Sequence, residues 1–183
     1  MGIFDHTSHL KPQGKEPACS DAEKRRRLIQ TLYVKKETVL PIENMTGLEI
    51  MQAMAQGVIP HPSIAETIPM KCVLAEKCRI VFEVKADKRH LNPLGGIHGG
   101  FSATVMDSVT GCVVHTMLDA GVGYGTIDLN VKMLKPVPKD ITLIAEGRII
   151  NVSKSLGVSE GTLKDEAGKL YAHSTATCKI FTI

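Results

Sequence analysis

The residues best suited to chemistry lie in two nearby places in the sequence. The first is the glycine-rich stretch at residues 92–100, which reads Asn-Pro-Leu-Gly-Gly-Ile-His-Gly-Gly, and the second is a single acid, Asp107. Glycines let a backbone approach a ligand closely, because no side chain stands in the way. A carboxylate can act as a general base or as a nucleophile. The two features are therefore candidates for an anion-binding loop and a catalytic carboxylate.

The stretch after His98 predicts a helix over residues 99–118 that begins at two glycines. The first N–H groups of a helix have no intrahelical partner, so those of Gly99 and Gly100 could stabilise a phosphate or a developing oxyanion. The pattern is neither a P-loop nor a dinucleotide-binding fingerprint. A glycine-rich turn that only packs tightly is an equally good interpretation of the loop taken alone.

The composition of this helix makes Asp107 unusual. Its residues are small or apolar on every side, which predicts a helix buried inside the protein, and Asp107 and His115 are its only acid and base. A buried carboxylate with no Lys or Arg within one turn is costly unless it has a function, and we interpret Asp107 as a general base. The alternatives are a backbone cap or a watery seam. A membrane span is disfavoured, because Asp107 would lie near its centre.

The spacing of the two candidates has a geometric consequence. Gly99 and Asp107 are eight residues apart, which is about 12 Å along a helix. A reacting carbon must lie about 3 Å from both its nucleophile and its oxyanion donors, so one helix cannot supply both. Two antiparallel copies related by a two-fold axis could do so. The spacing predicts an obligate dimer, with the oxyanion donor from one chain and the carboxylate from the other.

The rest of the sequence predicts elements that would surround this helix. A capping box of Thr46 and Glu49 starts a helix that ends at Gly57. Alternating apolar and polar residues predict strands over residues 70–74, 78–85, 127–133, 141–151, 155–164 and 169–182. We therefore predict an α+β domain over residues 46–183, in which an antiparallel sheet wraps around the long central helix. Residues 1–45 form an N-terminal arm with a short basic amphipathic helix after Ser20.

Composition excludes several classes of protein. The 183 residues carry a net charge of +3 and only 4% aromatic residues, which disfavours a nucleic-acid partner. The five cysteines form no C-x-x-C pair, so neither a disulfide scaffold nor a zinc ribbon is expected. No signal-peptide pattern opens the chain. We predict a cytoplasmic protein with no membrane partner and no metal.

The site residues resemble those of the hotdog-fold acyl-CoA thioesterases of the PaaI type, the phenylacetic acid degradation-related family. The matching pattern is Asn92-x-x-x-Gly96-x-His98-Gly99-Gly100 followed by Asp107, and the similarity spans residues 46–182. It includes Thr46-Gly47-Leu48-Glu49, Pro62-Ser63-Ile64-Ala65 and the strand that begins at Thr126. The resemblance implies a hotdog fold, a homodimer or dimer of dimers with sites at the dimer interface, acyl-CoA as substrate and no cofactor.

The resemblance also implies a role for each matched residue. Asp107 is the nucleophile or general base, and the Gly99 N–H polarises the thioester carbonyl. Asn92 and His98 orient the thioester or the attacking water, and Thr126, at the head of its strand, helps to place that water. The predicted substrate-binding residues are Gly100, Met106 and Thr110, with Lys135, Lys154 and Ser155 as candidates for the CoA phosphates.

The sequence leaves alternatives open. A hotdog hydratase is less favoured, because that chemistry usually needs a His and Asp pair, whereas His98 adjoins the oxyanion glycine. A non-catalytic acyl-CoA sensor would not need the carboxylate of Asp107. The subfamily suggests an aromatic or medium-chain acyl group, and the sequence does not choose between them.

Overall fold

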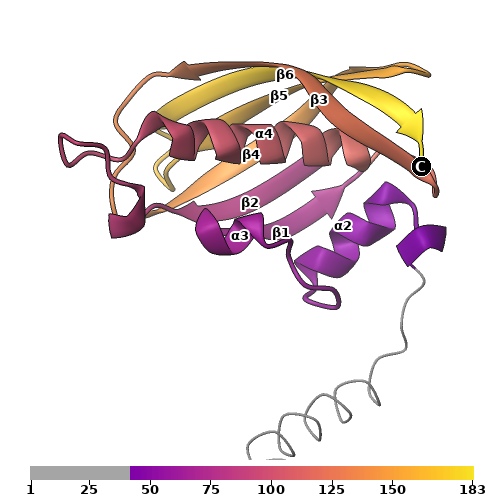
Figure 1. The fold of residues 1–183 in the computed structure, drawn as a ribbon, viewed down its shortest axis with the longest axis horizontal. Coiled ribbons are helices and arrows are strands. Elements are labelled where there is room, and N and C mark those ends of the chain that lie inside the picture. Colours follow the sequence, from indigo (N-terminus) through magenta and orange to yellow (C-terminus); the bar gives the residue numbers. More distant parts are fainter. Residues whose placement is uncertain (1–41) are drawn as a thin grey trace, which may run out of the picture. The chain divides into compact units, whose positions relative to one another are not determined.

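Residues 42–183 are described by a computed structural model of the chain (Figure 1). They form an antiparallel sheet, one long helix and several short helical segments. The basic helix predicted after Ser20, and residues 1–41 of the predicted arm, lie outside the described residues. Among the helices that are described, none combines the length and the apolar character needed to cross a lipid bilayer.

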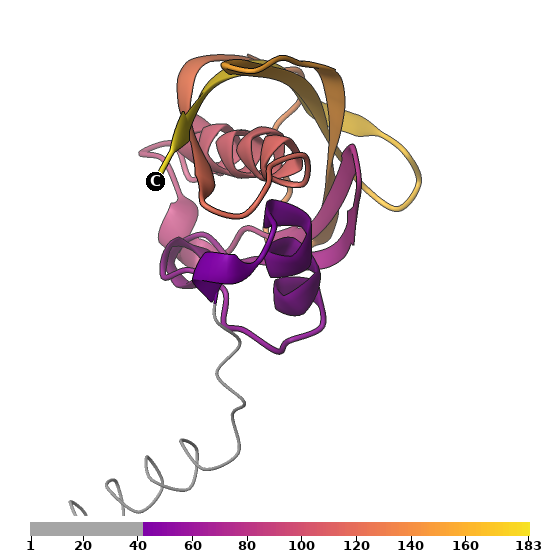
Figure 2. The same ribbon diagram turned by 90° about the vertical axis from the view of Figure 1, so that its right-hand side faces the viewer.

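The elements follow a simple order along the chain. They are η1 (Ile42–Asn44), α2 (Gly47–Ala55), α3 (Ile64–Thr67), β1 (Met70–Glu76), β2 (Arg79–Lys85), η2 (Lys88–His90), α4 (Gly99–His115), β3 (Val122–Met133), β4 (Thr142–Val152), β5 (Leu156–Lys164) and β6 (Leu170–Thr182). All neighbouring strands are antiparallel, in the order β1-β2-β4-β5-β6-β3. The sheet curls around α4, as Figure 2 shows in an end view. The predicted hotdog architecture, a sheet around a central helix, is confirmed.

Helix α2 begins and ends as its sequence predicts. The Thr46 side chain accepts a hydrogen bond from the Glu49 N–H at 3.3 Å, and the Glu49 carboxylate accepts one from the Thr46 N–H at 2.7 Å. This capping box satisfies N–H groups that the first turn leaves without partners. Gly57 follows the helix with a φ of 72°, a left-handed conformation that glycine adopts at low cost.

Helix α4 lies against the sheet where the strands lack side chains. A Cβ atom at Gly147 would lie 2.5 Å from the Val109 carbonyl oxygen, and one at Gly161 would lie 2.6 Å from Cε of Met106. These contacts hold the helix close to β4 and β5 and leave no room for a larger residue. The core around the helix consists of fully buried residues that include Ile80, Val84, Val105, Val113, Leu143 and Leu163.

One side of α4 is accessible, so the prediction of a helix buried on every side is wrong for the single chain. Gly100 and Asp107 are exposed, and Thr104 and Ser108 are half-buried. Their spacing of three and four residues places them along one side of the helix, and we call them the α4 strip. The hydroxyl groups of Thr104 and Ser108 donate to carbonyl oxygens four residues earlier, at 3.0 and 2.9 Å. The sequence did not predict this accessible side, because Gly100, Thr104 and Ser108 are small residues that are also compatible with a buried helix.

Candidate active site

Two cavities lie along α4, and the two principal candidates line different ones. The Asp107 cavity has a volume of about 230 Å³, and the Gly99 cavity has a volume of about 510 Å³. The first is lined by Met54, His61, Pro62, Ile64, Ala65, Met70, Phe82, Asp107, Ser108, Cys112, Tyr124 and Thr126. The second is lined by Asn92, Leu94, Gly96, Ile97, Gly99, Ser102, Met133, Leu134, Lys135, Pro136 and Val137. Gly99 and Asp107 thus occupy separate places in one chain, as their spacing requires.

The start of α4 distinguishes its two glycines. His98 is the N-cap residue, and its Nδ1 accepts a hydrogen bond from the Gly100 N–H at 2.8 Å. The N–H of Gly99, at the first helical position, has no acceptor among residues 42–183 and is therefore available to an oxyanion. Because its N–H is already used, Gly100 cannot supply that donor to a substrate. Since Nδ1 of His98 accepts, its ring proton lies on Nε2.

Asn92 shapes the loop before the helix. Its Oδ1 accepts hydrogen bonds from the N–H groups of Leu94 and Gly96, at 2.9 and 3.2 Å. The Asn92 N–H donates to the Gly96 carbonyl at 2.8 Å, which closes the turn. These bonds leave the Nδ2 donors of the Asn92 side chain for another acceptor. Asn92 thus fixes the loop that leads to Gly99, a contribution that the sequence pattern did not reveal.

A compact cluster in η2 connects this loop to α3. Arg89 donates to the Asp87 carboxylate with Nη2 at 2.7 Å and to the Glu66 carbonyl with Nη1 at 3.1 Å. Hydrogen bonds from Arg89 hold the pKa of Asp87 well below its usual range. Nε2 of His90 donates to the Thr67 carbonyl at 2.8 Å, and the His90 carbonyl accepts from the His98 N–H at 2.8 Å.

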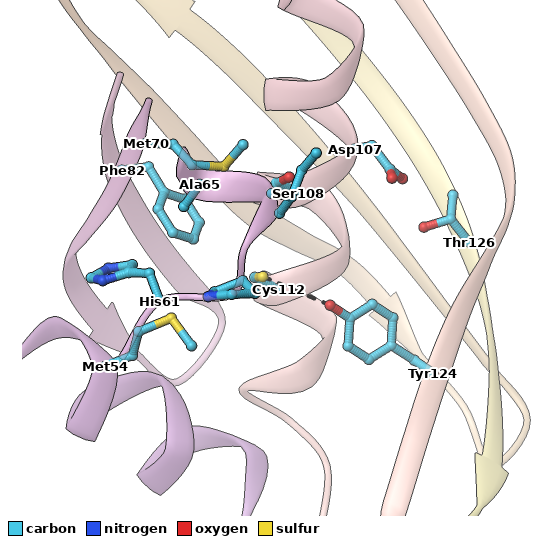
Figure 3. A pocket seen from close by; sticks show the side chains of 12 residues that line it. Met54, His61, Ala65, Met70, Phe82, Asp107, Ser108, Cys112, Tyr124 and Thr126 are labelled. Atoms are coloured by element: carbon cyan, nitrogen blue, oxygen red, sulfur yellow. Dashed lines mark hydrogen bonds between the residues drawn. The ribbon is translucent and has the colours of Figure 1, made fainter. Parts of the chain in front are cut away.

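The Asp107 carboxylate lies at the polar end of its cavity (Figure 3). It is exposed in the single chain, so the expected interior position is wrong. Thr126 lies beside it, and within the described part of the chain the hydroxyl of Thr126 has only the Cys178 sulfur as a partner, at 3.9 Å. A hydroxyl with so weak a partner can bind water. Thr126 is not at the head of its strand but at an irregularity inside β3, which begins at Val122.

Other candidate nucleophiles in the Asp107 cavity are inactive. Burial raises the pKa of the Cys112 thiol to about 12, so it carries almost no thiolate near neutral pH. The Ser108 hydroxyl donates to the Thr104 carbonyl, and no base among the described residues contacts it. No histidine in the described part of the chain forms a hydrogen bond or ion pair with Asp107. Asp107 is therefore the best remaining candidate for the nucleophile or general base in this cavity.

The opposite end of the Asp107 cavity is apolar. Met54, Met70 and Phe82 form its wall, from α2, β1 and β2 (Figure 3). His61 closes the wall, and its Nε2 accepts a hydrogen bond from the Cys72 N–H at 3.0 Å. Burial and the nearby Lys71 charge lower the pKa of His61, so its ring is neutral at pH 7. The cavity therefore joins a carboxylate to an uncharged apolar space.

Tyr124 is a cavity residue that sequence analysis did not identify. Its ring lies against α4 at Gly111, where a Cβ atom would be 2.7 Å from Cε2 of the ring. Its hydroxyl donates to the Cys112 sulfur at 3.7 Å. The available signal was Gly123-Tyr124-Gly125, an aromatic residue between two glycines. Pro62 and Ile64 also line this cavity. The sequence analysis used them only as part of the family resemblance and did not predict that they line a site.

The predicted substrate contacts are scattered. Met106 and Thr110 have no exposed surface and pack in the core beneath β5, so the prediction that they line the pocket is wrong for this chain. Lys135 lines the Gly99 cavity. Lys154 and Ser155 are exposed in the β4–β5 turn and line neither cavity.

The sheet shows how far apart these phosphate candidates lie. The Lys135 N–H donates to the Tyr171 carbonyl, and the Ser155 carbonyl accepts from the Ile180 N–H. Tyr171 and Ile180 are nine residues apart on β6, which is about 30 Å along a strand. Lys135 and Ser155 of one chain therefore cannot hold the same phosphate.

Comparison with known proteins shows what this chain is similar to. A family model described as the thioesterase superfamily matches residues 94–172, which include Gly99, Asp107 and Thr126. Over this stretch the chain is similar to the thioesterase superfamily. This thioesterase is 25% identical over 130 residues to acyl-coenzyme A thioesterase 13 of Mus musculus, covering 70% of this chain and 90% of the relative. The prediction of a thioester hydrolase is confirmed.

Solved structures show the resemblance to the predicted subfamily. A phenylacetic acid degradation-related protein from Ralstonia eutropha is 27% identical with a TM-score of 0.64, covering 70% of this chain and 98% of that protein. The fold is also shared with a Streptococcus mutans protein solved with acetyl-CoA bound, which is 24% identical with a TM-score of 0.56 and covers 62% of this chain and 89% of that one. The predicted resemblance to PaaI-type thioesterases is confirmed.

Proposed function

We propose that this thioesterase hydrolyses an acyl-CoA to a free acid and CoA. The proposal is supported by the mouse relative, whose name is acyl-coenzyme A thioesterase, and by the Asp107 cavity. A carboxylate at one end and an apolar wall at the other suit a thioester whose acyl group enters the cavity. The proposal includes no metal and no redox cofactor.

In the proposed reaction the Asp107 carboxylate has one of two roles. It either activates a water molecule that attacks the thioester carbon, or attacks that carbon itself. In one route the carboxylate removes a proton from water, the water oxygen bonds to the carbon, and the C–S bond breaks to release CoA as a thiolate. In the other route the carboxylate oxygen bonds to the carbon, CoA leaves, and water hydrolyses the resulting anhydride. Thr126 would position the water in either route. Protonation of the thiolate completes the reaction.

The oxyanion donor in this proposal comes from a second copy of the chain. The Gly99 N–H of the same chain lies about 12 Å from Asp107 along α4 and lines the other cavity. If the α4 strips of two copies face each other in antiparallel orientation, each Gly99 approaches the Asp107 of its partner. His98, through Nε2, and Asn92, through Nδ2, would then orient the thioester. Each site of the proposed homodimer is built from both chains.

A single observation carries the proposal: among the residues that the structure describes, Asp107 is the one acid that lines this largely apolar cavity, and the other polar groups of the lining are weak nucleophiles. The test is thiol release from short, medium, long and aromatic acyl-CoAs by wild type, Asp107→Asn and Asp119→Asn. Asp119 is an exposed acid after α4 that lines neither cavity, so its variant is the matched control.

We expect Asp107→Asn to lower kcat/KM at least about a hundredfold. The fold should persist, because Asp107 is exposed in the chain. Equal turnover in wild type and Asp107→Asn would refute the assignment of the carboxylate. Acyl-CoA binding by the wild type without turnover would instead support the sensor.

A further inference from the structure

The Tyr124 hydroxyl occupies a defined position along the Asp107 cavity. A Cβ atom at Gly111 would lie 3.3 Å from this hydroxyl oxygen. Gly111 follows Asp107 by four residues, about one turn or 6 Å along the same side of α4. Figure 3 shows Tyr124 on the same side of the cavity as Asp107 and Thr126 and across from Phe82, with its hydroxyl pointing toward Cys112. A ligand whose thioester carbon contacts Asp107 would pass this hydroxyl.

The hydrogen bond that Tyr124 makes is a weak one. Its partner is the Cys112 sulfur at 3.7 Å, and a thiol sulfur is a poor acceptor. A phenolic hydroxyl in an apolar setting usually finds an oxygen or nitrogen partner. Burial raises the pKa of Tyr124 well above its ordinary value, so the group remains a donor. An oxygen atom on a bound acyl group would be a better acceptor than the sulfur.

The charges of the cavity restrict the acyl group further. Among residues 42–183 of one chain, Asp107 is the only charged side chain that lines the cavity, because this lining contains no Lys or Arg and the His61 ring is neutral at pH 7. An acyl group with a second carboxylate would face the Asp107 charge and find no cation. The cavity volume of about 230 Å³ also limits the size of the acyl group that can enter.

From these observations we propose that Tyr124 is a specificity-determining residue, which selects uncharged acyl groups that carry an oxygen substituent about one helical turn from the thioester carbon. This inference rests on the proposed function, since it assumes that the thioester carbon is placed at Asp107. It assigns the hydroxyl of Tyr124 a substrate partner in place of Cys112. The length of the acyl group is then limited by the wall at His61 and Phe82.

The test uses three acyl-CoAs of equal chain length: hexanoyl-CoA, 5-oxohexanoyl-CoA and adipoyl-CoA. Their kcat/KM values are compared in wild type, Tyr124→Phe and Tyr171→Phe. Tyr171→Phe is the matched control, because the Tyr171 hydroxyl donates to Asp165 and lies outside the cavity. The readout is the ratio between substrates, which a general loss of packing at Tyr124 would not move.

We expect wild type to prefer 5-oxohexanoyl-CoA over hexanoyl-CoA by about threefold to tenfold, with adipoyl-CoA the poorest substrate. Tyr124→Phe should bring the first ratio to about one, and Tyr171→Phe should keep it. A wild-type ratio near one, or a ratio that Tyr124→Phe leaves unchanged, would overturn the inference. Failure of the proposed function has a different signature, in which wild type hydrolyses none of the three or Asp107→Asn hydrolyses them as well as wild type does.

Discussion

The two cavities along α4 differ in what they can supply to a reaction. The Gly99 cavity has a backbone donor at the helix start and a cation, Lys135, but no carboxylate. The Asp107 cavity has a carboxylate, the Thr126 hydroxyl and an apolar wall, but no Lys or Arg among the described residues that line it. Each contains what thioester hydrolysis needs and the other lacks. The difference suggests that one chain carries two halves of an active site, which only a second copy can complete.

The largest effect is expected when the oxyanion donor of the Gly99 cavity alone is removed, which tests whether that half of the site is needed for turnover. Gly99→Pro deletes the N–H, and proline is tolerated at the first position of a helix. His98 already has a φ of −64° and a ψ of 138°, an extended conformation that suits a residue before proline. We expect kcat to fall about 100-fold to 1,000-fold in acyl-CoA turnover, because one oxyanion donor is lost.

Gly99→Ala is the control for that experiment. It keeps the N–H but introduces the same Cβ atom, which would lie 2.7 Å from the sulfur of Met133. Met133 is exposed and its side chain is flexible, so it can move aside. Equal losses in Gly99→Pro and Gly99→Ala would show that crowding, not the missing donor, lowers the rate.

A second prediction tests whether the two halves belong to different chains. Asp107→Asn and Gly99→Pro homodimers are unfolded together, mixed in equal amounts and refolded. A mixed dimer has one site with both defects and one with neither, so random pairing should restore about a quarter of wild-type activity. Thiol release measures the recovery. Mixtures no more active than their separate components would mean that both groups act within one chain.

The third prediction concerns the cation of the Gly99 cavity. Lys135→Gln should raise KM for acyl-CoA about twofold to fivefold at low salt and less at high salt, because an exposed charge is screened. Lys154→Gln is the matched control, since Lys154 lines neither cavity. Steady-state kinetics at two ionic strengths measures the effect. A larger change in KM for Lys154→Gln than for Lys135→Gln would indicate that the CoA phosphates bind at the β4–β5 turn instead.

The smallest effect is expected at the end of α4, where His115 contacts the Tyr124 ring with centroids 5.4 Å apart. Burial lowers the pKa of His115 below its ordinary value of 6.5. Below pH 6.5 the unfolded chain therefore binds a proton that the folded chain resists. Stability is fully present above pH 6.5 and is lost as the pH falls through the folded-state pKa.

Urea unfolding between pH 7.5 and pH 5 measures this loss. His115→Gln should unfold with a weaker pH dependence than wild type, although His61, whose pKa is also lowered, retains part of it. Identical pH dependence in both proteins would mean that the environment of His115 is wet rather than apolar.

Much of the fold could be predicted because local signals and long-range packing agree. The capping box at Thr46 fixed the start of α2, and alternation located all six strands. Gly123 and Gly125 interrupt that alternation at the start of β3, so its first five residues were missed. The short helix α3 and the η2 cluster have too few residues to show a period.

The candidate site was only partly predictable, for a different reason. Gly99 and Asp107 were found because their residue types are unusual for a helix, and their separation followed from helix geometry. Tyr124 and His61 were not found, because only the folded chain brings β3 and the α2–α3 connection to one cavity. Met106 and Thr110 were misplaced, since hydropathy cannot tell which side of an apolar helix faces the sheet.

The glycine contacts beneath α4 have a consequence for how this protein could change over time. A Cβ atom at Gly147 or Gly161 would lie within 2.6 Å of an α4 atom, so substitutions at these two positions would displace the helix that carries Asp107. The apolar wall belongs to other elements, in which Phe82 is part of the core whereas Met54 of α2 is only partly buried. New acyl preferences could therefore arise by substitution of Met54, while α4 keeps its position on the sheet.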